Sequence, residues 1–149
     1  MIQLILCTGL IFCATDSLQM PMKISDRKFS FTPKLFHHPQ RVLFNSRTFD
    51  LEVFSDFPRD SVQSISLFYK TDTVPRYQEI PFDLHKKRFS YRYNPRKYPA
   101  NKITYFFTIS LTNGKLYGTP VDSVGQLLPV TKYLWDPREY YKQRASFRN

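Results

Sequence analysis

The feature that most constrains the fold of this chain is an alternating run of residues from position 103 to position 111. Apolar side chains occupy every second position of this run, namely Ile103, Tyr105, Phe107, Ile109 and Leu111. In an extended strand, side chains two positions apart lie on the same face. The run therefore predicts a long strand with one fully apolar face, and we expect it to be the central strand of a sheet.

Shorter segments with the same period of two occur along the rest of the chain, and Pro, Asp, Asn and Gly separate them. The strands that this pattern predicts cover residues 28–31, 42–44, 48–54, 62–71, 77–80, 88–93, 103–111 and 115–119. Asn113-Gly114 is a strong hairpin signal between the last two of these segments. The pattern predicts an all-β fold, an immunoglobulin-like antiparallel β-sandwich of about seven to eight strands.

One face of the predicted strands supplies the expected core. Its members are Phe49, Leu51, Val53, Ile65, Leu67, Tyr69, Phe89, Tyr91, Ile103, Tyr105, Phe107 and Ile109. Tyr105 stands near the start of the penultimate strand, just after a connection that contains proline. Sandwich domains place a tyrosine-corner residue there, so we expect the Tyr105 hydroxyl to bind backbone in the connection 94–101.

The C-terminal end has a different pattern, which predicts a short α-helix. Asp136 is suited to cap a helix, Pro137 to begin it, and Glu139 to reach back to the cap. Trp135 and Tyr140 stand at the two positions of a hydrophobic staple. We expect the helix to run from Pro137 to about Phe147, after a wrapping or linking stretch over 120–129.

The N-terminal segment 2–14 is apolar and uncharged, too short for a membrane span and typical of the apolar region of a signal peptide. We expect cleavage after Ser17, which would remove both cysteines, Cys7 and Cys13. Lipidation and a hydrophobic first strand of a cytosolic protein remain as alternatives. The favoured hypothesis is a protein that is secreted or located in the periplasm or cell envelope.

Catalytic and metal-binding patterns are not recognisable in the sequence. The four glycines do not form a phosphate-binding motif. His37 and His38 are adjacent and lack a further ligand at a suitable spacing, and we expect them to be solvated loop residues, with His85 at a strand end. We therefore predict no enzymatic activity, no cofactor and no metal.

The distribution of charge is more informative. The chain has a net charge of +10, and the stretch 84–121 holds eight basic residues and no acidic one. In the strand 88–93 the aromatic and basic residues alternate, so the bases should face solvent. The candidate surface for an anionic partner consists of Lys86, Lys87, Arg88, Arg92, Arg96, Lys97 and Lys102.

Three classes of partner fit such a surface in an exported protein: an acidic polysaccharide, an anionic membrane surface, or an acidic protein. Nucleic acid becomes the choice only if the N-terminal segment is not a signal peptide. The alternative is a purely structural spacer, in which the charges form a solvated surface only.

A family resemblance rests on short motifs in order along the chain: Tyr69-Lys70, Ile80-Pro81, the segment 103–106 and Asn113-Gly114. With these motifs, residues 48–119 resemble immunoglobulin-like or fibronectin-type-III-like domains of bacterial surface and secreted proteins. The resemblance implies a non-catalytic module for spacing, adhesion or ligand binding. The sequence patterns together predict four parts of the chain: a signal peptide over 1–17, N-terminal strands and a loop over 18–47, the sandwich core over 48–119, and a linker with the C-terminal helix over 120–149.

Overall fold

The structure is a computed structural model that describes residues 34–86 and 88–147. The expected signal peptide over 1–17, with its cleavage point, and the expected strand over 28–31 lie outside these residues. No helix among the described residues is long and apolar enough to cross a membrane.

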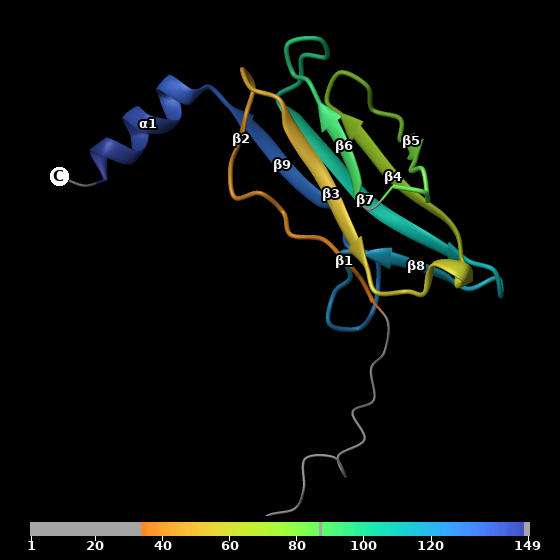
Figure 1. The fold of residues 1–149 in the computed structure, drawn as a ribbon. Helices are drawn as coiled ribbons and strands as arrows, with labels where there is room; N and C mark the ends of the chain where they lie inside the picture. Colours follow the sequence, from red (N-terminus) through yellow and green to blue (C-terminus); the bar gives the residue numbers. More distant parts are fainter. Residues whose placement is uncertain (1–33, 87, 148–149) are drawn as a thin grey trace, which may run out of the picture. The chain divides into compact units, whose positions relative to one another are not determined.

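Strands dominate the described part of the chain (Figure 1). They are β1 (Leu35–Phe36), β2 (Leu43–Phe44), β3 (Phe49–Ser55), β4 (Val62–Thr71), β5 (Gln78–Pro81), β6 (Phe89–Tyr93), β7 (Lys102–Leu111), β8 (Leu116–Thr119) and β9 (Val130–Trp135). A short 3-10 turn, Arg59–Ser61, precedes β4, and one α-helix, α1 (Pro137–Ser146), follows β9. The prediction of a β-rich fold with one C-terminal helix is therefore confirmed.

The strands form two sheets. The smaller sheet has the order β1-β3-β6, and the larger one has the order β2-β9-β7-β4-β5, with β8 also paired to β7. All pairs are antiparallel except β2 with β9, which run parallel. The longest ladder joins β4 to β7, in the register Leu67 opposite Phe107 and Tyr69 opposite Tyr105.

The core lies between the two sheets, and both contribute side chains to it. Ten of the twelve expected core residues are buried, while Phe89 and Tyr91 are half-buried and pack against the core. The core also takes in side chains outside that set, namely Tyr93 and Leu111, which continue the alternation of their predicted strands, and Leu35, Leu43 and Leu134. Leu35 and Leu43 belong to strands of two residues, which are too short to show a period.

Strand β9 was not expected, because the stretch after residue 119 was interpreted as a linker and a helix. The face of β9 that carries buried Leu134 also carries Lys132, and this interrupts the apolar pattern. β9 pairs with the first half of β7, and β8 pairs with the second half on the same side. Residues 120–129 form the loop that connects β8 to β9. The peptide bond between Thr119 and Pro120, where this loop begins, is cis.

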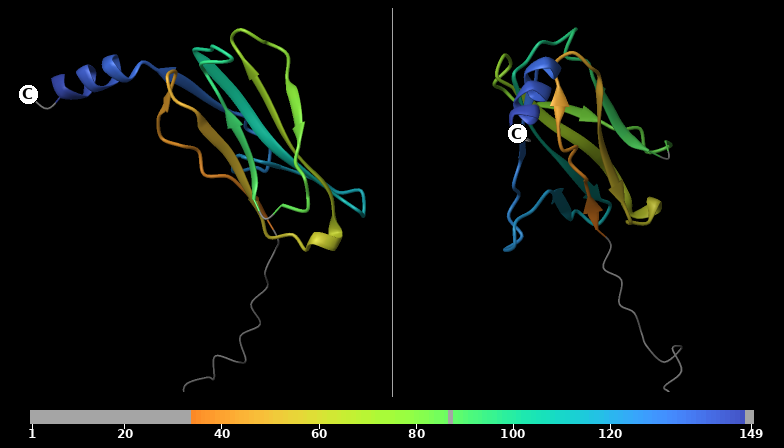
Figure 2. Two further views of the ribbon diagram at one scale, coloured as in Figure 1. Left: turned by 45° about the horizontal axis from the view of Figure 1, so that its top comes forward. Right: turned by 90° about the vertical axis from the view of Figure 1, so that its left-hand side faces the viewer.

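Helix α1 begins at Pro137 with Asp136 as its cap, as predicted, directly after β9 (Figure 2). The predicted bond from the Glu139 side chain back to the cap is not found among the described residues. The Asp136 carboxylate accepts hydrogen bonds from the backbone N–H groups of Arg138 and Glu139. None of the helix residues is buried, and its contacts with the sheet are aromatic. The Phe44 ring lies 5.6 Å from the Tyr140 ring and 6.1 Å from the Tyr141 ring, centroid to centroid.

Candidate binding surface

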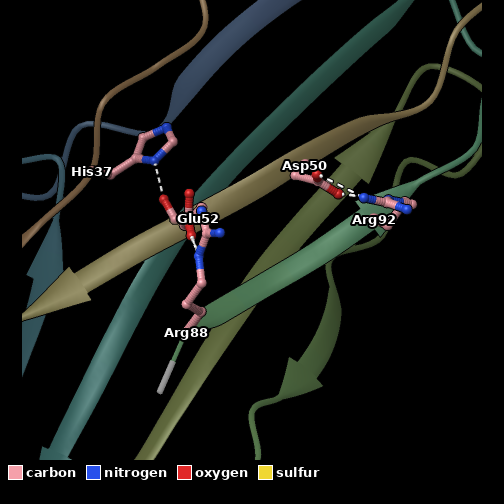
Figure 3. Close-up of polar contacts among 5 residues, drawn as sticks. All are labelled: His37, Asp50, Glu52, Arg88 and Arg92. Atoms are coloured by element: carbon pink, nitrogen blue, oxygen red, sulfur yellow. Dashed lines mark hydrogen bonds and ion pairs between the residues drawn. The ribbon is translucent and has the colours of Figure 1, made fainter. Parts of the chain in front are cut away.

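Two of the predicted basic residues are Arg88, just before β6, and Arg92, on β6. Their side chains point away from the core, as the alternation predicted, and both meet carboxylates of the neighbouring strand β3 (Figure 3). Arg88 Nε lies 2.6 Å from Glu52 Oε1. Arg92 Nε lies 2.9 Å from Asp50 Oδ1, and its Nη2 lies 3.2 Å from Asp50 Oδ2. These two cations therefore already have anionic partners within the chain.

The ion pair with Arg92 changes the pKa of the Asp50 carboxyl group. The hydrogen bond from Arg92 holds the pKa of Asp50 below its usual value, against a smaller opposing effect of burial. The acidic face of β3 and the basic face of β6 are far apart in sequence, so the acid-free stretch 84–121 gave no sign of this compensation.

The remaining predicted residues lie at different places. Lys86 is exposed before β6, and Lys102 is exposed at the start of β7. Arg96 and Lys97 lie in the connection 94–101 that joins β6 to β7. Lys87 lies outside the described residues. The structure therefore brings Arg96 and Lys97 together at one end of the sheets and separates Lys86 from them by the length of β6.

A polar hollow of about 440 Å³ lies at this end, and we call it the arginine hollow. It is lined by Ser46, Arg47, Thr48, Asn94 and Arg96. Arg96 Nε donates a hydrogen bond of 3.0 Å to the Ser46 carbonyl, which ties the connection 94–101 to the turn after β2. None of the five lining residues is acidic, so the two guanidinium groups have no carboxylate beside them in the hollow.

Arg47 was missed by the sequence analysis. It stands outside the acid-free stretch, in the turn between β2 and β3. Its guanidinium carbon lies 5.9 Å from the centroid of the Phe44 ring. The signal available in the sequence was a lone arginine in a short polar turn, and such a residue is usually solvated.

A larger hollow of about 740 Å³ adjoins the same connection, and we call it the tyrosine hollow. Its lining residues are Tyr69, Thr71, Thr73, Val74, Gln78, Ile80, Tyr91, Tyr93, Lys97, Tyr98 and Pro99. They come from β4, β5, β6 and two connections, so both sheets contribute to its walls. The alternation of 88–93 predicted only that Tyr91 and Tyr93 face inward, not that a hollow forms beside them.

Hydrogen bonds hold the walls of the tyrosine hollow in place. The Tyr69 hydroxyl donates to Gln78 Oε1 over 2.8 Å and lies 3.4 Å from the Tyr91 hydroxyl. Burial and the contact with Tyr91 raise the pKa of Tyr69 far above its usual value, so Tyr69 is a neutral hydrogen-bonding group at physiological pH. The hollow therefore presents aromatic rings together with neutral hydroxyl and amide groups.

Further hydrogen bonds fix the connection 94–101. The Tyr93 hydroxyl donates to the Tyr98 carbonyl over 2.7 Å, and Thr73 Oγ1 donates to the Pro99 carbonyl over 3.2 Å. The Asp72 carboxylate accepts from the backbone N–H groups of Asn101 and Lys102. Burial acts to raise the pKa of Asp72, but these hydrogen bonds together outweigh it and hold the pKa below its usual value.

The tyrosine-corner prediction was wrong in its residue. Tyr93, at the end of β6, makes the hydroxyl-to-backbone bond within the connection 94–101, whereas Tyr105 bonds to His37. The expectation that His37 is a solvated loop residue was also wrong, because its ring is partly buried and stacks edge-on against Tyr105. Its Nδ1 bonds to the Glu52 carbonyl of β3 (Figure 3). His37 therefore connects the segment after β1 to both sheets.

The groups that this end of the molecule presents are basic, polar and aromatic. Within the described residues no three His, Cys, Asp or Glu side chains lie close enough to hold a metal ion. What the two hollows offer is guanidinium and ammonium groups, hydroxyls, a carboxamide and aromatic faces. No protein-family model matches this chain, and no curated protein matches it.

Proposed function

We propose that this protein is a non-catalytic interaction module, secreted or located in the periplasm or cell envelope, and that it binds an anionic partner. The observation that carries the proposal is the arginine hollow, which places Arg47 and Arg96 together with three polar residues and no carboxylate. Arginine is suited to carboxylate, sulfate and phosphate groups because its planar guanidinium can donate two parallel hydrogen bonds to them.

We further propose an immunoglobulin-like or fibronectin-type-III-like fold. The strand orders β1-β3-β6 and β2-β9-β7-β4-β5 support it, because the chain crosses between the two sheets five times, after β1, β2, β3, β5 and β6. Sandwiches of this class show such crossings between two largely antiparallel sheets. Domains of this class commonly serve as scaffolds for binding or spacing, which agrees with the proposed role.

The structure refines which basic residues we assign to the partner. Arg88 and Arg92 are paired with Glu52 and Asp50, so a ligand anion would have to compete with carboxylates already in place. Arg47 and Arg96 face no such competitor among the residues that line their hollow. We therefore assign the binding role to the end of the sheets that carries Arg47, Arg96 and Lys97.

Two matched double variants test this assignment. Arg47→Gln with Arg96→Gln and Arg88→Gln with Arg92→Gln remove the same net charge. We expect the first pair to weaken binding to heparin and to phosphatidylglycerol vesicles by about tenfold or more, since each lost charge-assisted hydrogen bond is worth ~1.5 to 3 kcal/mol. We expect the second pair to change binding by less than about threefold, since exposed paired charges contribute little.

The outcomes separate the proposal from its rivals. An equal loss in both double variants would mean that only net charge matters and would contradict the assignment to the hollow. Absence of binding by the unmodified protein to either probe would leave the spacer as the function. Circular dichroism of all variants checks that the fold is retained.

The proposed location has its own test. N-terminal sequencing of the protein recovered from its native host should find a chain that begins after residue 17, in the secreted or envelope fraction. Recovery from the cytosol with Met1 intact would contradict export and favour a cytosolic or nucleic-acid-binding role.

A further inference from the structure

We propose that the anionic partner is an acidic oligosaccharide, with its sugar rings in the tyrosine hollow and its acidic groups on Lys97, Arg96 and Arg47. The inference rests on the proposed function, because it names the ligand class for the same end of the molecule. It is carried by the chemistry of the tyrosine hollow and by the way the hollows follow one another around the connection 94–101.

The first observation is the aromatic character of the tyrosine hollow. Tyr69 and Tyr91 stack with ring centroids 5.5 Å apart, and Tyr93 meets Tyr69 edge-on at 6.0 Å. Tyr98 stands at the rim with 51% of its surface exposed, and the Lys97 ammonium lies 5.3 Å from the centre of its ring. A pyranose ring has one face of C–H groups, and an exposed aromatic ring is the surface on which such a face packs.

The second observation is the polar part of the same hollow. The single hydroxyl proton of Tyr69 goes to Gln78 Oε1, so in the contact between the two tyrosines the Tyr91 hydroxyl must be the donor. The lone pairs of the Tyr91 oxygen and the N–H groups of the Gln78 carboxamide have no hydrogen-bond partner among the described residues and are available to a ligand. A few fixed donors and acceptors on a largely apolar wall are typical of a small-molecule site, and this volume lies within the usual range.

The third observation is the continuity of the hollows. A smaller hollow of about 260 Å³ shares Thr73 and Pro99 with the tyrosine hollow, and its other lining residues include Asn45 and Pro95. These two residues are the chain neighbours of Ser46 and Asn94, which line the arginine hollow. Figure 1 shows the three segments involved, the turn 45–48, the loop 72–77 and the connection 94–101, at the same end of the sheets.

Charge distinguishes an acidic glycan from a neutral one. None of the residues that line the three hollows is acidic. Asp72 stands beside the lining residue Thr73, but both its oxygens accept hydrogen bonds from the residues that end the connection, Asn101 and Lys102. Lys97 lines the tyrosine hollow and Arg96 lines the arginine hollow, so two residues adjacent in the chain supply a cation to each hollow.

The connection that carries these groups is held by hydrogen bonds without a ligand. The Tyr98 backbone is fixed through the Tyr93 hydroxyl, and Pro99 is fixed through Thr73. Ligand binding then costs little ordering of the chain, which favours affinity. The Tyr98 side chain makes neither of these bonds, so it can be removed while the connection stays in place.

Binding measurements on the full protein test the inference with Tyr98→Ala and Lys97→Gln. The probes are a galacturonate hexasaccharide, a heparin-derived hexasaccharide and, as neutral control, maltohexaose, each titrated by calorimetry. Tyr133→Ala is the matched control, because Tyr133 is also an exposed tyrosine, 62% exposed, but it lines none of the three hollows. We expect at least one acidic hexasaccharide to bind, and each test variant to weaken it by about tenfold, as for loss of one stacking ring or one charged contact. Tyr133→Ala should leave it unchanged.

The other outcomes each overturn the inference, and most leave the proposed function standing. If acidic hexasaccharides depend on Arg47 and Arg96 but not on Tyr98, the ligand does not use the tyrosine hollow. If only phosphatidylglycerol vesicles bind, and do so through the two arginines, the partner is a membrane surface. If a proline-rich peptide, titrated beside the hexasaccharides, binds while they do not, and its binding needs Tyr98, the tyrosine hollow is a peptide groove. Equal binding of maltohexaose overturns the acidic specificity, and binding of no anionic probe overturns the proposed function as well.

Discussion

The Nε2 atom of His37 lies 2.9 Å from the hydroxyl oxygen of Tyr105, and this contact joins the segment after β1 to the central strand β7. The other ring nitrogen, Nδ1, faces the Glu52 carbonyl, which can only accept a hydrogen bond. The proton of the neutral ring therefore belongs on Nδ1, and Nε2 accepts from Tyr105. A second proton on Nε2 would turn this acceptor into a donor and leave the hydroxyl proton of the buried Tyr105 without an acceptor.

The first prediction concerns pH. Burial, together with the positive charges of His38 and Lys132, lowers the pKa of His37 below its ordinary value of 6.5, despite the opposing contact with Glu52. The folded state therefore binds this proton less readily than the unfolded state does. The stabilisation is complete above about pH 7 and is lost as the pH falls from about 6.5 through the lower pKa of the folded state.

Urea unfolding at a series of pH values measures this effect. The free energy of unfolding should fall between about pH 7 and pH 5 in the unmodified protein, and the fall should be smaller in His37→Gln. His85→Gln is the control, because His85 is exposed. A slope that His37→Gln leaves unchanged would show that another group titrates in this range. Asp50 and Asp72, with lowered pKa values, lose their contribution at more acidic pH than His37.

The second prediction is the cost of removing the Tyr105 hydroxyl. Tyr105 is 1% exposed, so Tyr105→Phe leaves Nε2 of His37 without its donor in a partly buried site. We expect a loss of about 1 to 3 kcal/mol in the free energy of unfolding, measured by urea titration. Tyr133→Phe, on the exposed outer side of β9, should change stability by less than about 0.5 kcal/mol. A similar result for the two variants would mean that the bond to His37 adds nothing to stability.

The third prediction concerns the connection 94–101. Tyr93→Phe removes the donor to the Tyr98 carbonyl, and we expect a loss of about 0.5 to 1.5 kcal/mol. Amide hydrogen exchange in residues 96–101 should become faster, because this bond holds the connection. Tyr98→Phe leaves the backbone bond intact and should show neither effect.

The fourth prediction tests the core between the sheets. Phe107 is fully buried on β7 and pairs with Leu67 across the ladder to β4. Phe107→Ala should lower the free energy of unfolding by about 3 to 5 kcal/mol, through lost burial and the cavity that remains. Phe106→Ala, one residue away on the opposite face, should cost clearly less. Equal costs would mean that the two faces of β7 are equally buried.

The fifth prediction concerns the cap of α1. Asp136→Ala removes the acceptor for two backbone N–H groups, and we expect the first turn of the helix to lose about 1 kcal/mol of local stability. Because no residue of α1 is buried, global unfolding should hardly change, and the effect should be visible as faster amide exchange at Arg138 and Glu139. Asp136→Asn, which keeps an acceptor oxygen, should restore most of the protection.

Local patterns were sufficient for most of the elements. The alternation of 62–71 predicted β4 with its observed bounds, and that of 103–111 predicted β7 to within one residue. The cap residues before Pro137 predicted where α1 begins. These features depend on side chains a few positions apart, so a single segment contains the information.

The partners of each residue required the tertiary structure. Arg88 and Arg92 meet acids 36 and 42 positions earlier in the chain, and His37 meets Tyr105 across 68 positions. The same holds for Arg47 and Arg96, which the turn after β2 and the connection after β6 bring to one hollow. No local pattern links such pairs.

The sequence by itself therefore determined which segments are extended, which faces are apolar and where the C-terminal helix begins. Only the tertiary structure decided that Tyr93 rather than Tyr105 holds the connection 94–101 and that His37 is partly buried. It also decided that Arg88 and Arg92 form ion pairs with Glu52 and Asp50. The physical reason is that the period of a strand is a property of one segment, whereas pairing depends on the register and order of strands in two sheets. A shift of one residue in register would turn every side chain of a strand to the other face and change all of these partners.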